Sequence, residues 1–583
     1  MPNGIASPAE QAAQEALERL FACLDEHRNF LLEAGAGAGK TYSLVQALRY
    51  LIENRATDLA RKHQQIACIT YTNVAADEIV SRTDSHPVVH ASTIHAFCWS
   101  FIKAFQPQLR PLVPSLKNWE GRLNEAEVEA DQIAPRTVEY DFGYPSINDT
   151  KVLLHHDDVI ELTVKLMDNP KFRSLFVDRY PIIFVDEYQD TNKDFADSLV
   201  NHFIAERTGP LIGFFGDHWQ QIYRHTCGKI EHAELEVIDK QANFRSVQRV
   251  VDCLNLIRPE LTQFVDDTET EGYAAVFHSN NWVGQRQTGP HNGGDLPPDV
   301  ADRYLQALID RLTQEGWDFS PEKAKILMLT HNVIADKQGY RNLANVFPNK
   351  DALIKKEDAH IAFLADMLEP VCEAFENRRY GEMFSVLDKR TPTIRSHADK
   401  EAWSADLNAL NALRADGTIG EVLDHLKATQ RPRVSSAVER RERDLEELNR
   451  NPVEEEPSSI TRLRALRDIP YAELRACAKF IDDKTPFSTK HGVKGAEFEN
   501  VLVVFGRGWN LYNFNQYLEL AADPTNVPAA RREMYERNRN LFYVCCSRPK
   551  RRLALLFTQE LSAAALETLS GWFGADAISA LEV

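Results

Sequence analysis

Residues 31–43 read LLEAGAGAGKTYS, and this stretch limits the possible folds more than any other part of the chain. Glycine loses more backbone entropy on folding than any other residue, so its repetition here needs a structural reason. Apolar residues 29–34 predict a buried strand before it, and the leucine spacing of residues 41–55 predicts a helix after it. Strand, glycine-rich turn and helix in this order predict a turn whose amides face an anion at the helix N-terminus.

The turn has the sequence of a phosphate-binding loop, or P-loop. Lys40 is expected to neutralise the β- and γ-phosphates of a nucleotide, and the Thr41 hydroxyl to hold Mg²⁺. The usual pattern G-x-x-x-x-G-K-[ST] begins with glycine, whereas this chain has Ala34 there. A glycine-rich turn without a ligand is the alternative. The predicted nucleotide site contains Ala34, Gly35, Ala36, Gly37, Ala38, Gly39, Lys40, Thr41 and Tyr42.

Two adjacent carboxylates follow another apolar segment, in IIFVDEYQD at residues 182–190. The carboxyl ends of parallel strands form the ligand edge of a doubly wound sheet. We therefore expect Asp186 to organise Mg²⁺ and Glu187 to polarise the attacking water. A helix cap is the alternative for such a pair, but beside a P-loop the pair predicts a nucleoside triphosphatase.

Strand-like segments alternate with helical ones along most of the chain, which predicts an α/β fold with parallel sheets and crossover helices. Their spacing indicates two α/β cores, with a charge-rich helical region between parts of the second core. The further strand-like segments are QQIACITYTN (64–73), GPLIGFFGDHWQ (209–220), KAKILMLTHN (323–332), NVLVVFG (500–506) and RRLALLFT (551–558).

Composition narrows the class of protein. The net charge of −19 argues against a passive nucleic-acid coat, although an acidic protein can still hold nucleic acid in a local groove. None of the nine cysteines forms a C-x-x-C pair, so we expect buried thiols in a reducing cytoplasm. The sequence contains no apolar run of about 18 residues and no secretion signal, which favours a cytoplasmic protein without membrane contact.

Eight motifs in a fixed order resemble those of the UvrD/Rep family of superfamily 1 DNA helicases. They are AGAGAGKT, TYTNVAADEI, STIHAFC, VDEYQDTN, GDHWQQIY, ANFRS, TKHGVKGAEF and RNLFYVCCSR. The resemblance implies two RecA-like parallel-sheet motor domains of the P-loop type, with ATP between them and mainly helical accessory insertions. The expected ranges are 1–104 and 155–230 for the first core, 231–344 and 484–583 for the second, 105–154 for a short insert and 345–483 for a helical domain.

The resemblance also implies roles around the triphosphate. Gln220 of GDHWQQIY corresponds to the glutamine that couples the γ-phosphate to DNA. Arg245 and Arg548 match the two arginine fingers of the family, which the second core offers to the phosphates. A finger supplied across a cleft reaches the transferred phosphoryl group only when the cleft closes. A surface salt bridge is the alternative role for each arginine.

Three further positions correspond to contacts with the nucleoside. Gln11 matches the glutamine that reads adenine, with Gln14 as a close rival. Phe244 stands where an aromatic side chain packs on adenine, and Glu497 matches the ribose contact. These assignments follow from the resemblance and imply that ATP, with Mg²⁺, is the nucleotide.

The DNA contacts implied by the family lie in three of the motifs and just after a fourth, GDHWQQIY. Hydroxyl and imidazole groups of this kind bind phosphates without reading sequence. His225 replaces a tryptophan that stacks on a base in the family, so a packed loop histidine is the alternative, with Trp219 the next candidate for stacking. The implied DNA-binding residues are Tyr71, Thr72, Asn73, Thr93, His95, His225, Thr489 and His491.

These expectations combine into an ATP-dependent DNA helicase or translocase that moves 3′ to 5′ on single-stranded DNA, in repair or anti-phage defence. Only 35 residues follow Arg548, so we expect any nuclease to be a separate partner subunit, as for short UvrD-like helicases of the Gabija type. A DNA-stimulated NTPase, or a nucleotide-gated DNA clamp that serves a nuclease without processive unwinding, is the alternative.

The acidic balance yields a prediction about DNA binding. A local phosphate-tracking groove releases counterions on binding, so affinity for single-stranded DNA should fall at least about tenfold between roughly 50 and 200 mM salt. The affinity should show little sequence preference. Fluorescence anisotropy with labelled oligonucleotides measures both quantities, and an affinity independent of salt would contradict the groove.

Overall fold

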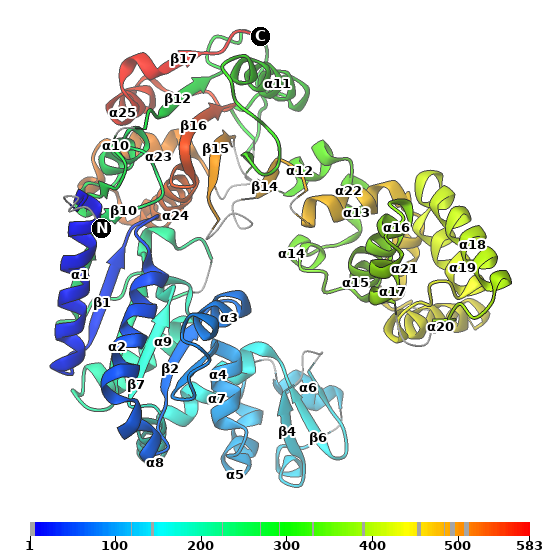
Figure 1. The fold of residues 1–583 in the computed structure, drawn as a ribbon, viewed down its shortest axis with the longest axis horizontal. Helices are drawn as coiled ribbons and strands as arrows, with labels where there is room; N and C mark the ends of the chain where they lie inside the picture. Colours follow the sequence, from blue (N-terminus) through cyan, green and yellow to red (C-terminus); the bar gives the residue numbers. More distant parts are fainter. Residues whose placement is uncertain are drawn as a thin grey trace. The chain divides into compact units, whose positions relative to one another are not determined.

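The computed structural model consists of two compact units (Figure 1). Unit 1 comprises Met1–Asn281, Trp509–Ala554 and Glu560–Ala580, and unit 2 comprises Trp282–Gly508, Leu555–Gln559 and Leu581–Val583. The structure describes residues 6–117, 119–126, 128–140, 145–223, 226–268, 270–290, 292–328, 331–387, 391–451, 456–482, 484–489, 496–506 and 512–583.

The first parallel sheet lies in unit 1 and has six strands in the order β3-β2-β7-β8-β1-β9. All of its neighbouring pairs are parallel. The four inner strands are buried along their whole length, which explains their continuous apolar sequences. The strands are β1 (Phe30–Ala34), β2 (Ile66–Thr70), β3 (Val89–Thr93), β7 (Ile182–Asp186), β8 (Leu211–Gly216) and β9 (Glu236–Lys240).

The edge strand β9 extends the first sheet beyond the boundary that the sequence predicts at residue 231. It pairs with β1 in a register that sets Ala34 opposite Lys240, so it ends beside the P-loop. Its sequence, EVIDK, mixes exposed and buried residues, as an edge strand does. It therefore lacks the continuous apolar run that marks the inner strands in the sequence.

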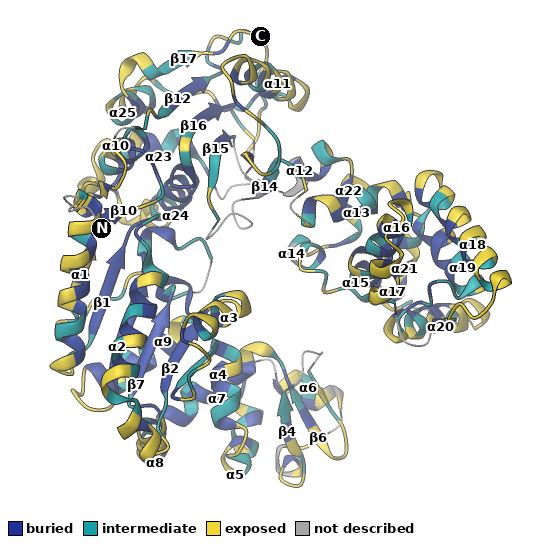
Figure 2. Cartoon of the chain, in the orientation of Figure 1, coloured by how far each residue is buried: buried dark blue, intermediate teal, exposed yellow. Residues whose placement is uncertain are grey.

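Helices cover both faces of the first sheet, and each face has its own core. Leu31 and Val185 belong to one core cluster, whereas Leu32 and Phe184 belong to the other, because consecutive residues of a strand face opposite sides. Figure 2 shows the buried strands between helices whose outer faces are exposed. These helices are α1 (Pro8–Asp25), α2 (Lys40–Arg61), α3 (Asn73–Arg82), α4 (Ile94–Ile102), α7 (His156–Met167), α8 (Pro170–Arg179) and α9 (Lys193–Leu199).

The segment between α4 and α7 forms a small subdomain on one of these cores. Trp119 and Val152 join the same cluster as Leu31, and the Trp119 indole donates to Asp158 at 2.8 Å. In its three-stranded sheet β6 pairs parallel with β4 and antiparallel with β5. The elements are α5 (Gln106–Leu109), α6 (Trp119–Glu125), β4 (Thr137–Tyr140), β5 (Ser146–Ile147) and β6 (Lys151–Leu154).

The remainder of unit 1 comes from residues 241–281 and from the C-terminal part of the chain. The short strands β10 and β11 pair in parallel, as do β12 and β17. The elements are β10 (Ala242–Asn243), α10 (Gln248–Ile257), β11 (Phe264–Val265), β12 (Tyr273–His278), α23 (Phe514–Ala521), α24 (Ala529–Cys546), α25 (Ala563–Phe573) and β17 (Ile578–Ala580). Strand β16 (Pro549–Phe557) continues from unit 1 into unit 2 after Ala554.

Unit 2 contains a second set of parallel strands, in which β13 pairs with both β14 and β15. Its strands are β13 (Ala324–Met328), β14 (Phe487–Thr489) and β15 (Phe498–Phe505), and α11 (Pro298–Gln314) precedes them. Two sets of parallel strands, each with helices, confirm the predicted α/β class with two RecA-like regions.

Between β13 and β14 the described residues of unit 2 are helical (Figure 1). The charge-rich sequence near residue 440 forms an amphipathic helix that buries Val438, Glu442 and Leu445. The helices are α12 (His331–Gln338), α13 (Arg341–Val346), α14 (Lys350–Ile354), α15 (Ala359–Phe363), α16 (Glu369–Glu376), α17 (Tyr380–Val386), α18 (His397–Asp416), α19 (Ile419–Thr429), α20 (Ser436–Arg450), α21 (Ser458–Arg467) and α22 (Tyr471–Ile481).

Among the described residues, no helix combines the length and the apolar character that a membrane span requires.

Candidate nucleotide site

The P-loop runs from the end of β1 to the start of α2, and its glycines have specific steric roles. Gly37 and Gly39 have φ angles of 77° and 73°, in the left-handed region that other residues rarely adopt. A Cβ atom on Gly35 would lie 2.7 Å from the Gln263 side chain, and one on Gly37 would lie 2.7 Å from Arg245 Cβ. The backbone angles and the neighbouring side chains therefore require glycine at these positions.

Carbonyl groups of the loop are bound by donors from the segments around β10 and β11. The Asn243 and Gln263 amides donate to the Ala36 carbonyl at 3.1 and 3.2 Å, and the Phe244 N–H donates to the Gly37 carbonyl at 2.9 Å. These bonds give the carbonyl oxygens donors within the protein, and a free carbonyl oxygen would repel a phosphate. The ANFRS motif thus supports the phosphate-binding loop directly.

Lys40 and the carboxylate pair meet at the carboxyl edge of the first sheet. Lys40 Nζ lies 3.6 Å from Glu187 Oε1, and both side chains are largely buried. Glu187 follows β7 with a φ of 47°, which is an unfavourable conformation for glutamate, and the Gln189 amide donates to its carboxylate. Strained backbone of this kind is concentrated at functional sites. The structure therefore brings together the predicted phosphate cation and the predicted base.

Thr41 and Asp186 supply the donor set predicted for Mg²⁺. Asp186 is the last residue of β7 and is 5% exposed, and Thr41 lies in the first turn of α2. Hydroxyl and carboxylate oxygens are hard ligands, and Mg²⁺ is usually held by one or two such groups plus water and phosphate oxygens. The residues fit the ion, which would neutralise phosphate charge when bound.

Gln220 and the two predicted arginine fingers lie together within unit 1. Arg548 Nη2 donates to Gln220 Oε1 at 3.1 Å, and Arg245 Nη1 donates to the Ser547 carbonyl at 3.0 Å. Arg548 is 1% exposed. Burial, followed by the neighbouring charge of Arg245, lowers the pKa of Arg548 to about 9. A cation held against such a cost is suited to an anionic ligand.

The predicted nucleoside contacts are partly assembled. Phe244 is 46% exposed, and its N–H bond to Gly37 sets it next to the loop, so part of its side chain is accessible to a ligand. The Gln11 amide donates to the Ala6 carbonyl at 3.0 Å, whereas the Gln14 amide donates to Glu18. Glu497 is exposed and belongs to unit 2. Their roles toward adenine and ribose stay predictions.

Aromatic residues from two motifs meet near the predicted DNA contacts. Tyr71 is 43% exposed and stacks on Tyr223 with a centroid distance of 5.1 Å. Tyr223 was missed by sequence reasoning, although it ends the motif GDHWQQIY. Trp219, by contrast, is 6% exposed, with the guanidinium of Arg539 4.2 Å from its ring centroid. Trp219 is therefore a core residue rather than a base-stacking platform.

The remaining predicted DNA contacts occupy helix starts or strand ends. Thr72 caps α3 by accepting from the Ala75 N–H, Asn73 begins α3, and Thr93 precedes α4. Burial, with a smaller effect from His156, lowers the pKa of His95 to about 4, so His95 is neutral at pH 7. Thr489 ends β14 in unit 2, while His225 and His491 lie outside the described residues.

Lys240 is a second lysine beside the P-loop that sequence reasoning missed. Its side chain is fully buried, and its ammonium donates to the Gly39 carbonyl at 3.0 Å and to the Ser43 hydroxyl at 2.7 Å. Burial, followed by the charge of Lys40, lowers its pKa to about 8. Its position before ANFRS was the available signal, but its contact with the loop depends on the pairing of β9 with β1.

The chain is similar to known DNA helicases and to a Gabija protein. A family model described as an AAA domain matches residues 13–226. The Gabija protein GajB of Bacillus cereus is 24% identical to the chain, over 94% of this chain and 96% of the relative. The DNA helicases PcrA of Bacillus subtilis and Rep of Buchnera aphidicola are 28% and 27% identical, each over 39% of this chain and over 36% and 40% of their own lengths.

The chain is similar in sequence to the UvrD/Rep-like superfamily 1 helicases. The matches to PcrA and Rep cover less than half of this helicase, whereas the GajB match extends over nearly all of it. The likeness to GajB therefore includes the accessory regions as well as the motor motifs.

Replacing Glu187 by glutamine tests the predicted base of this helicase. Glutamine keeps the shape of the side chain but accepts no proton, so ATP turnover should fall at least about 10²-fold. ATP binding should remain, because the substitution removes the carboxylate that pairs with Lys40 and leaves the lysine available to the phosphates. Steady-state ATPase assays and binding of a fluorescent ATP analogue measure the two effects. Wild-type turnover in Glu187→Gln would exclude this role.

Lys240→Met tests the second lysine. The variant removes a buried cation from the back of the loop, so ATP affinity should fall about tenfold, which corresponds to about 1.4 kcal/mol. Because the pKa of Lys240 is about 8, its charge is present below pH 8 and is lost above it. ATP affinity of the wild type should therefore decline between pH 7 and pH 9, roughly the range that spans this pKa, more than that of Lys240→Met.

The matched control for this experiment is Lys325→Met, which changes a buried lysine of unit 2 whose ammonium donates to the Thr485 carbonyl at 2.9 Å. Its ATP affinity and pH profile should follow the wild type. Equal effects of the two substitutions would show that the loss reflects general destabilisation.

Proposed function

We propose that this chain is an ATP-driven motor that moves 3′ to 5′ along single-stranded DNA and serves anti-phage defence beside a separate nuclease. The observation that carries the motor assignment is the contact of Gln220 with Arg548, next to a P-loop whose lysine faces Glu187. Likeness to the Gabija protein GajB over 94% of this chain supports the defence role.

The site residues have separate roles in ATP hydrolysis. The P-loop amides and Lys40 bind the triphosphate, and the Thr41 and Asp186 oxygens hold Mg²⁺. Glu187 polarises the attacking water and takes its proton. Arg245 and Arg548 stabilise the negative charge that spreads over the transferred phosphoryl group, which is the main source of catalysis in such reactions.

A single short segment connects the phosphates with the DNA side. Gln220 contacts Arg548, and three residues later Tyr223 stacks on Tyr71, whose ring is 43% exposed. A shift of Gln220 when the γ-phosphate leaves would therefore move the aromatic pair. Aromatic rings hold bases by stacking, at roughly 1–3 kcal/mol per base, without regard to sequence. His225, predicted to stack, continues the same segment.

The second candidate function is a DNA-stimulated NTPase or nucleotide-gated clamp that serves the nuclease without processive unwinding. The replacement of the family tryptophan by His225 favours this candidate, because an imidazole has a smaller stacking face. Both functions share the hydrolytic site, so they differ only in strand displacement.

Two DNA substrates test the function: a duplex with a 3′ single-stranded tail and a duplex with a 5′ single-stranded tail. The wild type should hydrolyse ATP in response to single-stranded DNA and displace the strand of the 3′-tailed duplex. Arg548→Ala should lower turnover by about 10³-fold at saturating DNA, because the transition state loses a cationic donor. Its DNA affinity should be unchanged in anisotropy measurements.

Each outcome separates the candidates. ATP turnover without displacement of either duplex supports the NTPase or clamp. Displacement of the 5′-tailed duplex alone contradicts the polarity, and normal turnover in Arg548→Ala contradicts the finger role. A wild type that hydrolyses no ATP with DNA present refutes the motor.

A further inference from the structure

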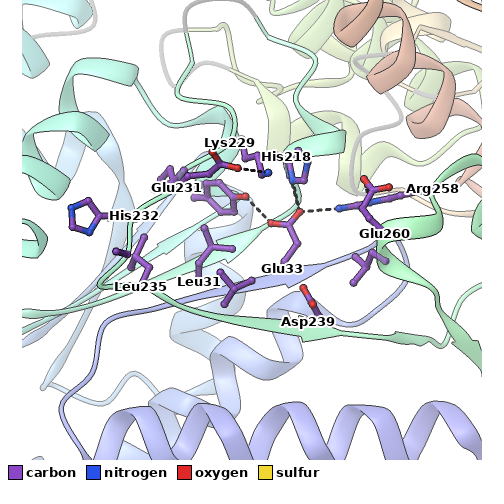
Figure 3. A pocket seen from close by; sticks show the side chains of 15 residues that line it. Leu31, Glu33, His218, Lys229, Glu231, His232, Leu235, Asp239, Arg258 and Glu260 are labelled. Carbon is purple, nitrogen blue, oxygen red and sulfur yellow. Dashed lines mark hydrogen bonds and ion pairs between the residues drawn. The ribbon is translucent and has the colours of Figure 1, made fainter. Parts of the chain in front are cut away.

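Arg258 is a buried arginine outside the eight motifs. It follows α10, and its side chain is 2% exposed. Its Nη1 lies 2.6 Å from Asp217 Oδ1. Its Nη2 lies 3.0 Å from Glu33 Oε1, a pair that Figure 3 shows. A buried guanidinium is tolerated only when it is paired and hydrogen-bonded, and here it bridges two buried carboxylates.

The first of these carboxylates belongs to the strand that leads into the P-loop. Glu33 precedes Ala34 on β1 and also accepts from the Tyr188 hydroxyl at 2.7 Å, while His218 Nδ1 lies 2.7 Å from it. Burial raises the pKa of Glu33, but the bonds and charges of His218, Arg258 and Tyr188 lower it to about 2. Glu33 is therefore ionised at neutral pH and requires its cation.

The second carboxylate holds Gln220. Asp217 Oδ2 accepts from the Gln220 amide at 2.8 Å, and Asp217 Oδ1 accepts from the Trp219 N–H at 3.0 Å. An amide donates through nitrogen and accepts through oxygen. Because its nitrogen faces Asp217, the oxygen of Gln220 faces Arg548, at 3.1 Å from Nη2.

Aromatic rings from two motifs enclose the guanidinium. Its carbon lies 5.2 Å from the ring centroid of Trp219 and 5.5 Å from that of Tyr543, whose hydroxyl is 3.4 Å from the Ala36 nitrogen. Arg258 therefore contacts three segments of the site. They are the strand that precedes the P-loop, the motif that contains Gln220, and the helix that precedes Arg548.

A metal ion is the rival explanation for this cluster. Donor atoms of Glu33, Asp217 and His218 lie within 4.8 Å of one another among the described residues. Both carboxylates already face the same guanidinium, so a divalent ion would have to displace it. Arg258 supplies the positive charge that such an ion would bring.

We propose that Arg258 is a positioning residue for ATP hydrolysis, which fixes Asp217 and thereby directs the oxygen of Gln220 toward Arg548. This inference rests on the proposed function, because it assigns Arg258 a part in the turnover of the same site. Arg258 touches neither nucleotide nor DNA in this role, and it acts through Asp217 alone.

Arg258→Lys is the first test. Lysine keeps the charge but lacks the planar fork that bridges two carboxylates. We expect kcat to fall at least about tenfold with KM for ATP within about twofold, because the lost orientation matters in the transition state. In a Gln220→Ala background the same substitution should change kcat less than about twofold, since residues that act as a unit are not additive.

A second pair of variants remains informative if Arg258→Lys does not fold. Asp217→Asn should lower kcat more than Glu33→Gln, since Gln220 is bound to Asp217. A purely structural role predicts that kcat falls only in step with thermal stability, because each carboxylate has three partners in the structure. Thermal unfolding is measured for each protein, with Arg414→Lys as the matched control.

Arg414 is also 2% exposed and paired with two glutamates, at 2.7 and 2.8 Å, but in unit 2. Arg414→Lys should leave kcat at the wild-type value. A folded Arg258→Lys with wild-type kcat, full additivity with Gln220→Ala, or a stoichiometric metal ion bound by Glu33, Asp217 and His218 each overturns the inference. A wild type without ATPase activity instead refutes the proposed function.

Discussion

The nucleotide site depends on the hydrogen bonds that the Asn243 and Gln263 amides donate to the Ala36 carbonyl. A P-loop binds phosphate only if its carbonyls face away from the ligand, and glycine alone does not decide which way they face. Here the donors come from residues more than 200 positions later in the chain. The ANFRS motif that contains Arg245 also binds the loop, so the proposed phosphate contacts and the proposed arginine finger depend on the same segment.

Buried charge is the second organising constraint of unit 1. Arg258, Lys240 and Arg548 are almost fully buried, which is costly for cations unless partners compensate. Arg258 has carboxylate partners, whereas Lys240 bonds to a carbonyl and a hydroxyl. Burial, followed by a neighbouring cation, lowers the pKa of Lys240 to about 8 and that of Arg548 to about 9. A triphosphate is the ligand that would complete such a site.

The segment from Asp217 to Tyr223 connects the proposed phosphate site with the proposed DNA-binding side. It begins at a carboxylate held by Arg258, carries Gln220 to Arg548, and ends at a ring that stacks on Tyr71. Helix α24 binds the same segment, because the Asn540 amide donates to its His218 and Gln221 carbonyls at 3.1 Å. A change at the phosphates therefore has a short, packed route to the proposed DNA side.

The sequence by itself determined the P-loop, the carboxylate pair and the parallel α/β class, because these depend on local glycine spacing and apolar runs. It could not identify β9, whose edge pattern is weak, nor Lys240 and Arg258, which lie outside the motifs. It also left Trp219 as a candidate for stacking, although packing between guanidinium groups and Tyr543 buries it. Only the tertiary structure decided these cases, because burial and charge pairing arise between residues distant in sequence.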